Sequence, residues 1–103
     1  MRVLFVVFND MFATREEIKS FLDNDEDVFY WQYSLPNSIF VSTKLTDDAL
    51  ASKLEGQFGV KPGALFLVTE ISGDTSQGRL PRDSWRVINN PDDPWPRQPS
   101  KKK

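Results

Sequence analysis

The residues that usually carry enzyme chemistry are sparse in this chain of 103 residues. It contains no histidine, the commonest general base and a frequent metal ligand, and no cysteine, which excludes thiolate nucleophiles, thiolate metal sites and disulfides. Ser72, Ser76 and Ser84 have no evident base to activate them, so a hydrolase triad is not expected. The remaining candidates are carboxylates, arginines and aromatic rings.

Two charged groups stand out. The acidic run DNDED, at 23–27, lacks the glycine and the terminal glutamate of a calcium-binding EF-hand loop, so its pattern favours a solvated turn. Arg79, Arg82 and Arg86 cluster near the C-terminus, where they could contact phosphate or pair with acids on a partner. The net charge of −2 favours the second option, because residues 91–103 are net positive and the rest of the chain is therefore more acidic still. Nucleic acid is a doubtful partner for such a domain.

The strands and helices that position these residues can be predicted from local sequence signals. The run RVLFVVF is typical of a strand buried on both faces, Thr14 with Glu17 predicts a capping box, and Thr46 predicts a second helix start. Pro36 and Asn37 predict a hairpin turn. The predicted strands lie near 2–8, 28–34, 38–43 and 64–71, and the predicted helices near 15–23 and 47–58.

This order predicts an α+β protein with the ferredoxin-like βαββαβ arrangement. Right-handed crossovers would place both helices on one face of a four-stranded antiparallel sheet, with the first and third strands central. A C-terminal arm follows the fourth strand. We predict one domain at 1–89 and a disordered tail rich in proline and lysine at 90–103, in which Trp95 is either a short recognition motif or an unstructured remnant.

The predicted strands are apolar on both faces, although helices would cover only one. The second face needs another cover: the arm at 79–88 folding back, or a second copy of the chain. We expect both, with the homodimer contact the larger and Trp85 substantially buried; an open aromatic face is the alternative. The predicted partner-binding residues are Phe29, Trp31, Tyr33, Arg79, Arg82 and Trp85.

The apolar N-terminal run is too short to span a bilayer and no small-residue cleavage site follows it, so we expect a cytoplasmic protein without a membrane partner.

The strings VLFVVFND, WQYSLPNSIFVST, LTDDALASKL, LFLVTEISGD and GRLPRDSW together resemble a group of small prokaryotic proteins labelled SinR-like. These resemble the CRISPR-associated ferredoxin-like endonuclease and adaptor family and virulence-associated protein D. The resemblance covers about residues 1–89. It implies a ferredoxin-like fold and a face-to-face homodimer.

In the CRISPR-associated relatives, an aspartate at the end of the first strand is the proposed metal ligand. Asn9 occupies the matching position here, and Asp10 lies one residue later. The resemblance therefore leaves two functions open. The first is a non-catalytic dimeric interaction module without a cofactor, an adaptor or a component of a defence or toxin–antitoxin system with a protein partner. The alternative is a weak nuclease acting on RNA or DNA with Mg²⁺ held between two Asp10 carboxylates.

Overall fold

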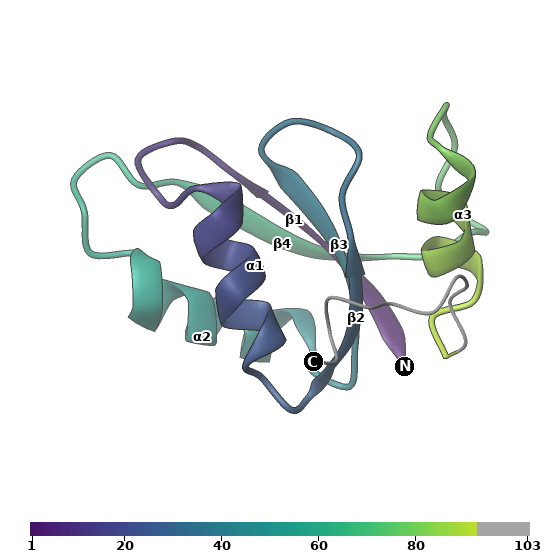
Figure 1. Ribbon diagram of the computed structural model, residues 1–103, viewed down its shortest axis with the longest axis horizontal. Coiled ribbons are helices and arrows are strands. Elements are labelled where there is room, and N and C mark those ends of the chain that lie inside the picture. The colour runs from purple at the N-terminus through teal and green to yellow at the C-terminus, as the bar shows by residue number, and fades with distance from the viewer. Residues whose placement is uncertain (93–103) are drawn as a thin grey trace.

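The computed structural model describes residues 1–92; the proposed disorder of 93–103 and the role of Trp95 lie outside the described residues. These residues form an α+β fold with a four-stranded antiparallel sheet and three helices (Figure 1). In chain order the elements are β1 (Arg2–Phe8), α1 (Arg15–Asp23), β2 (Val28–Gln32), β3 (Ser38–Thr43), α2 (Asp47–Phe58), β4 (Phe66–Ile71) and α3 (Arg82–Asn89).

Local signals set the helix and turn boundaries. Thr14 and Glu17 form the predicted capping box, in which each side chain accepts a hydrogen bond from the other residue's backbone N–H. The hydrogen bond from the Thr14 backbone is the main cause that lowers the pKa of Glu17. Thr46 caps α2 through the N–H of Ala49, as predicted. Asn37 adopts a left-handed conformation, with φ of 54°, which confirms its predicted place in the hairpin turn.

The order of strands in the sheet is β2-β3-β1-β4, with every neighbouring pair antiparallel. The pairing of β1 with β4 is regular from Val3 opposite Ile71 to Phe8 opposite Phe66. β1 and β3 therefore have neighbours on both sides, whereas β2 and β4 are edge strands.

One face of the sheet packs against α1 and α2. Leu4, Val6 and Phe8 of β1 meet Ile18 and Leu22 of α1 and Leu50 and Leu54 of α2, and all of them are buried. Alternate residues of a strand point to the same face, which explains why the even-numbered positions of β1 share this core. Phe12, in the loop after β1, stacks on Phe66 with ring centroids 4.4 Å apart and closes the core at that end.

α3 packs against the opposite face, where Val87 and Ile88 contact Val3, Tyr30 and Phe40. Figure 1 shows α3 on the far side of β2 and β3 from α1 and α2. The predicted arm is therefore a helix, and it covers the second face at the end where β1 begins. Ser84 donates a hydrogen bond to Ser34 at 2.9 Å, which satisfies its buried hydroxyl.

Contacts continue beyond the predicted domain boundary at 89/90. The hydroxyl of Ser42 donates to the carbonyl of Pro91, and the N-terminal ammonium of Met1 lies 2.7 Å from a carboxylate oxygen of Asp92. The segment 90–92 thus belongs to the folded unit. Within residues 1–92, no helix has the length and apolar character needed to cross a bilayer.

Candidate interaction surface

The second face of the sheet is covered only in part. Val7 of β1 is 37% exposed, and Leu65 and Leu67 at the start of β4 are 67% and 61% exposed. Val7 lies opposite Leu67 in the β1–β4 ladder, and Leu65 lies two residues before Leu67, so the three side chains share one side of the sheet. We call these three residues the open patch.

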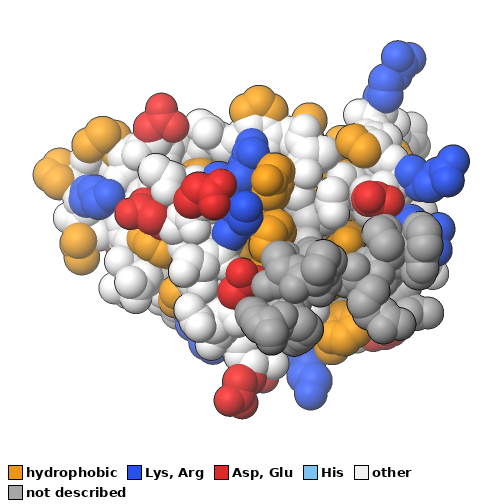
Figure 2. All heavy atoms as spheres, viewed as in Figure 1, with side chains coloured by type: hydrophobic (Ala, Val, Ile, Leu, Met, Phe, Trp, Pro, Cys, Tyr) orange, Lys and Arg blue, Asp and Glu red, His pale blue; other side chains and the backbone are white. Residues whose placement is uncertain are grey.

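The open patch lies beyond the reach of α3. Val3, Phe5 and Val7 point to the same face, but α3 contacts the group around Val3, and Phe5 stacks on Phe40 with centroids 4.7 Å apart. Val7 is left without such a cover. In Figure 2, hydrophobic side chains also gather at the end of the molecule formed by the β1–α1 and α2–β4 loops, where Met11 and Val60 are exposed.

Asn9 fixes the start of β4 and so the position of the open patch. Its side-chain oxygen accepts hydrogen bonds from the N–H of Phe12 (3.1 Å) and of Leu65 (3.0 Å), and its amide nitrogen donates to the carbonyl of Gly63 (2.9 Å). Gly63 adopts φ of +81°, a left-handed conformation that favours glycine. An aspartate could accept the first two bonds but could not donate the third. Asn9 is therefore a structural amide that joins the end of β1 to the start of β4.

Asp10 is exposed, and its nearest polar partner is the amide of Asn37 at 3.4 Å. Among residues 1–92, no three histidine, cysteine, aspartate or glutamate side chains lie together as ligands for a metal ion. The structure thus places Asp10 on the surface just after the end of β1, next to Met11.

The predicted group of Phe29, Trp31 and Tyr33 does not share an open face. A bulge in β2 places Val28 opposite Thr43 and Tyr30 opposite Ser42, so the alternation of side chains shifts between them. Trp31 is consequently buried in the core under α1, and Phe29 is left exposed at the bulge. The expectation that all three line the second face is wrong, because it assumed an unbroken period of two residues.

Trp31 and Tyr33 form a closed cluster with α1 instead. Their rings stack with centroids 5.9 Å apart, and Trp31 donates to Asp23 at 2.7 Å. The guanidinium of Arg15 lies 4.1 Å from the centre of the Tyr33 ring, and the ammonium of Lys19 lies 5.2 Å from that of Trp31. These cations occupy the ring faces, so the cluster holds α1 on the sheet.

The other predicted partner-binding residues lie on the α3 side. Arg79 and Arg82 are exposed and make no ion pair within residues 1–92. Trp85 packs at the margin of the second core and is mostly buried, in agreement with the expectation, whereas Val87 and Ile88 lie fully inside that core. The helix turns the aliphatic pair further inward than the ring.

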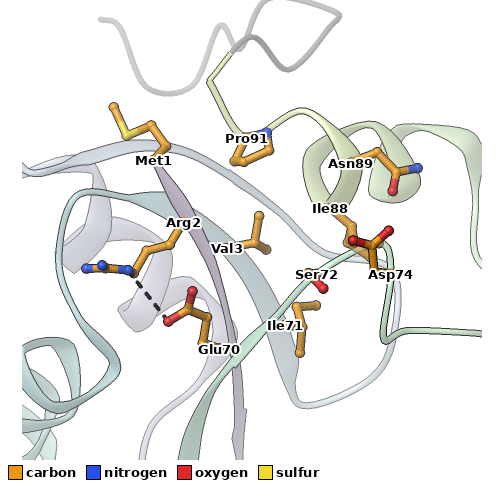
Figure 3. Close-up of a pocket in the computed structure, with 11 residues that line it drawn as sticks. Met1, Arg2, Val3, Glu70, Ile71, Ser72, Asp74, Ile88, Asn89 and Pro91 are labelled. Carbon is orange, nitrogen blue, oxygen red and sulfur yellow. Dashed lines mark ion pairs between the residues drawn. The ribbon is translucent and has the colours of Figure 1, made fainter.

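A pocket of about 320 Å³ lies where the end of α3 approaches the start of β1 and the end of β4 (Figure 3). Arg2 and Glu70 on its wall form an ion pair at 3.6 Å, the pairing expected from the antiparallel strands. Gly73 lies directly under Asn89, because a Cβ at that position would come within 1.9 Å of the Asn89 side-chain oxygen. The residues that line the pocket on this side are thus the same ones that hold α3 against the loop after β4.

Two carboxylates of the acidic turn after α1 pair with a lysine of α2. The ammonium of Lys53 on α2 lies 2.7 Å from Asp25 and 4.0 Å from Asp27. The hydrogen bond to Asp25 raises the pKa of Lys53. This turn therefore ties α1 to α2, and the exposed ammonium is screened enough that the pair adds little to stability.

Leu65, Leu67 and Val7 are not among the partner-binding residues predicted from the sequence. The signal was present, because Leu65 and Leu67 alternate with Phe66 and Val68 in a strand that is apolar on both sides. What the pattern lacked was the position of α3, which decides which part of the second face stays open.

Comparisons of the chain with protein-family models, with curated proteins and with solved structures return no match.

Proposed function

We propose that the protein is a non-catalytic interaction module with a ferredoxin-like topology that acts as a homodimer. The observation that carries this proposal is the open patch, three exposed apolar side chains that adjoin one another on the second face of the sheet. Apolar surface of this kind on a small domain is typical of a protein contact. The domain is also small enough to gain stability from a partner subunit.

The arrangement of the chain supports the ferredoxin-like topology. The order β2-β3-β1-β4 has two central strands and two edges, and each of α1 and α2 connects an edge strand to a central one. The shared core of α1, α2 and the even-numbered positions of β1 agrees with two helices on one face. The resemblance to SinR-like and CRISPR-associated proteins is part of this proposal and points to an adaptor role.

Within residues 1–92, no segment covers the open patch, because α3 packs at the other end of the same face. Asp92, the last described residue, is held beside Met1 at the start of β1, and Val7 lies roughly 20 Å further along that strand. A second copy of the chain presents the same apolar patch, so it is the occupant we propose.

Sedimentation velocity at micromolar concentration tests the proposal. We expect about twice the monomer mass for the unaltered protein and the monomer mass for Leu67→Lys, because a charge in the contact would be desolvated. Phe29→Lys is the matched control, since Phe29 is comparably apolar and exposed but lies on the opposite edge strand. A clean monomer for the unaltered protein would refute the homodimer.

A nuclease assay tests the alternative function. We expect labelled RNA and duplex DNA to remain intact with Mg²⁺ or Mn²⁺, because Asn9 is used to hold β4 and Asp10 belongs to no cluster of three metal-ligating side chains within residues 1–92. Cleavage that disappears in Asp10→Ala would overturn the non-catalytic proposal.

A further inference from the structure

The edge of β4 is an unprotected hydrogen-bonding surface. The strand is regular over its whole pairing with β1, carries no proline, and has a single charged residue, Glu70. The other edge strand, β2, is shorter and interrupted by its bulge, a feature that blunts an edge against pairing. Of the two edges, β4 is therefore the one suited to accept another strand.

The ladder shows which backbone groups of β4 are available. The carbonyl of Leu65 accepts a hydrogen bond from the N–H of Asn9 at 3.1 Å, so the backbone of Leu65 points toward β1. In an antiparallel ladder this direction alternates along the strand. The N–H and C=O groups of Phe66, Val68 and Glu70 consequently point away from β1, and no hydrogen bond within residues 1–92 involves them.

The open patch alone is too small for a stable homodimer. Such an interface buries about 800 Å² on each partner, more than three aliphatic side chains present. Leu65 and Leu67 belong to the same segment as the free edge, so an interface that combines the patch with the edge uses both surfaces. A flat contact on the patch alone would leave the backbone groups of β4 unpaired.

We infer that two copies of the chain join through their β4 edges, antiparallel about a two-fold axis at Val68, so that the sheet runs on from one copy into the other. This inference rests on the proposed homodimer and specifies its contact. In that register Val68 lies opposite its own copy and Phe66 lies opposite Glu70, which pairs all the outward backbone groups of the strand. Leu67 then lies opposite Thr69 and Leu65 opposite Ile71, which joins the open patches on one side of the extended sheet.

The lack of native cysteine permits a direct test by crosslinking. Directly opposite residues in a hydrogen-bonded antiparallel pair have Cα atoms about 5.5 Å apart, within the range that a disulfide spans. Under mild oxidation, Val68→Cys is expected to form a disulfide-linked dimer. Phe29→Cys, on the exposed edge at β2, is the matched control and is expected to stay mostly uncrosslinked. Equal crosslinking of the two variants would overturn the inference.

Two substitutions of Val68, one by proline and one by alanine, give an independent test. The N–H of Val68 points out of the sheet, so Val68→Pro removes no hydrogen bond within the copy but blocks pairing across the edge. We expect its dimer dissociation constant to rise roughly tenfold or more, as the loss of edge hydrogen bonds implies. Val68→Ala, which keeps the N–H but loses the same side-chain packing, is expected to dimerise more tightly than the proline variant.

The outcomes separate the inference from the function it rests on. If Val68→Pro keeps its circular dichroism and dimerises as tightly as Val68→Ala, the contact lies elsewhere and the inference fails while the homodimer stands. If the unaltered protein is a monomer, the proposed homodimer is refuted, and the inference about its contact is refuted with it. If Val68→Pro does not fold, the crosslinking of Val68→Cys against Phe29→Cys decides.

Discussion

The two faces of the sheet differ in how completely they are covered. On the first face, α1 and α2 extend over the sheet and leave Leu22, Leu50 and Leu54 without exposed surface. On the second face, the single short helix α3 covers one end, and Leu67 at the other end stays 61% exposed. The difference shows that one side of a sheet can be a closed core while part of the other side stays exposed and apolar.

The largest expected effect comes from the same substitution made on both faces. Leu54→Ala on the first face should lower the free energy of unfolding by about 3 kcal/mol, because it leaves a cavity in a filled core. Leu67→Ala on the second face should change that of the monomer by less than about 0.5 kcal/mol, while weakening self-association. Urea unfolding at low protein concentration measures both, and similar costs would show that the second face is as closed as the first.

A smaller effect is expected within the part of the second face that α3 covers. Ile88→Ala should cost about 2 kcal/mol, because Ile88 is 3% exposed between α3 and the sheet. Trp85→Ala should cost only about 1 kcal/mol, since the ring lies at the margin of the same core. Chemical denaturation ranks the two variants. A larger loss for Trp85→Ala would mean that the ring, and not the aliphatic pair, docks the helix.

The smallest expected effect is the response of the second face to alkali. Burial, with a contribution from Asp83 of α3, raises the pKa of Tyr30 above its ordinary value of about 10. The neutral hydroxyl is favoured in the folded protein, so this stability is complete below pH 10 and is lost as the pH rises through the folded pKa. Tyr30→Phe should therefore flatten the fall of the urea midpoint as the pH rises above 10.

Part of that fall should remain in Tyr30→Phe. The pKa of Lys53, which joins α2 to the acidic turn on the first face, is raised as well, and its pairing weakens in the same direction. An unchanged slope in the Tyr30 variant would show that alkali acts on the protein through other groups.

Much of the fold could be predicted because its signals are local. The apolar run of β1, the capping box of Thr14 and Glu17, and the turn at Asn37 each depend on a few neighbouring residues. The predicted ranges of β1, β3, α1 and α2 agree with the structure, whereas β2 and β4 are shorter by two residues. β4 begins later because the turn at 61–64, closed by the hydrogen bond from Ala64 to Lys61, precedes it.

The candidate surface was less accessible to sequence reasoning. Trp31 and Phe29 were assigned to one face, but the bulge in β2 separates them, and a bulge is set by the pairing with β3 and not by the residues of β2 alone. The side chain of Asn9 joins Phe12 to Gly63 and Leu65, which lie more than fifty residues away in the chain. No pattern in the segment around Asn9 announces those partners.

The sequence by itself determined which segments become the four strands and the helices α1 and α2, and that the sheet is apolar on both sides, because propensity, capping and periodicity act over a few residues. Only the tertiary structure decided how the second face is divided. The eight residues of α3 can cover one end of the sheet, and Gly73 and Ser34 set which end, through close approach to Asn89 and a hydrogen bond to Ser84. Leu65, Leu67 and the free edge of β4 remain outside that cover because packing between distant segments, and not local preference, chooses what is left exposed.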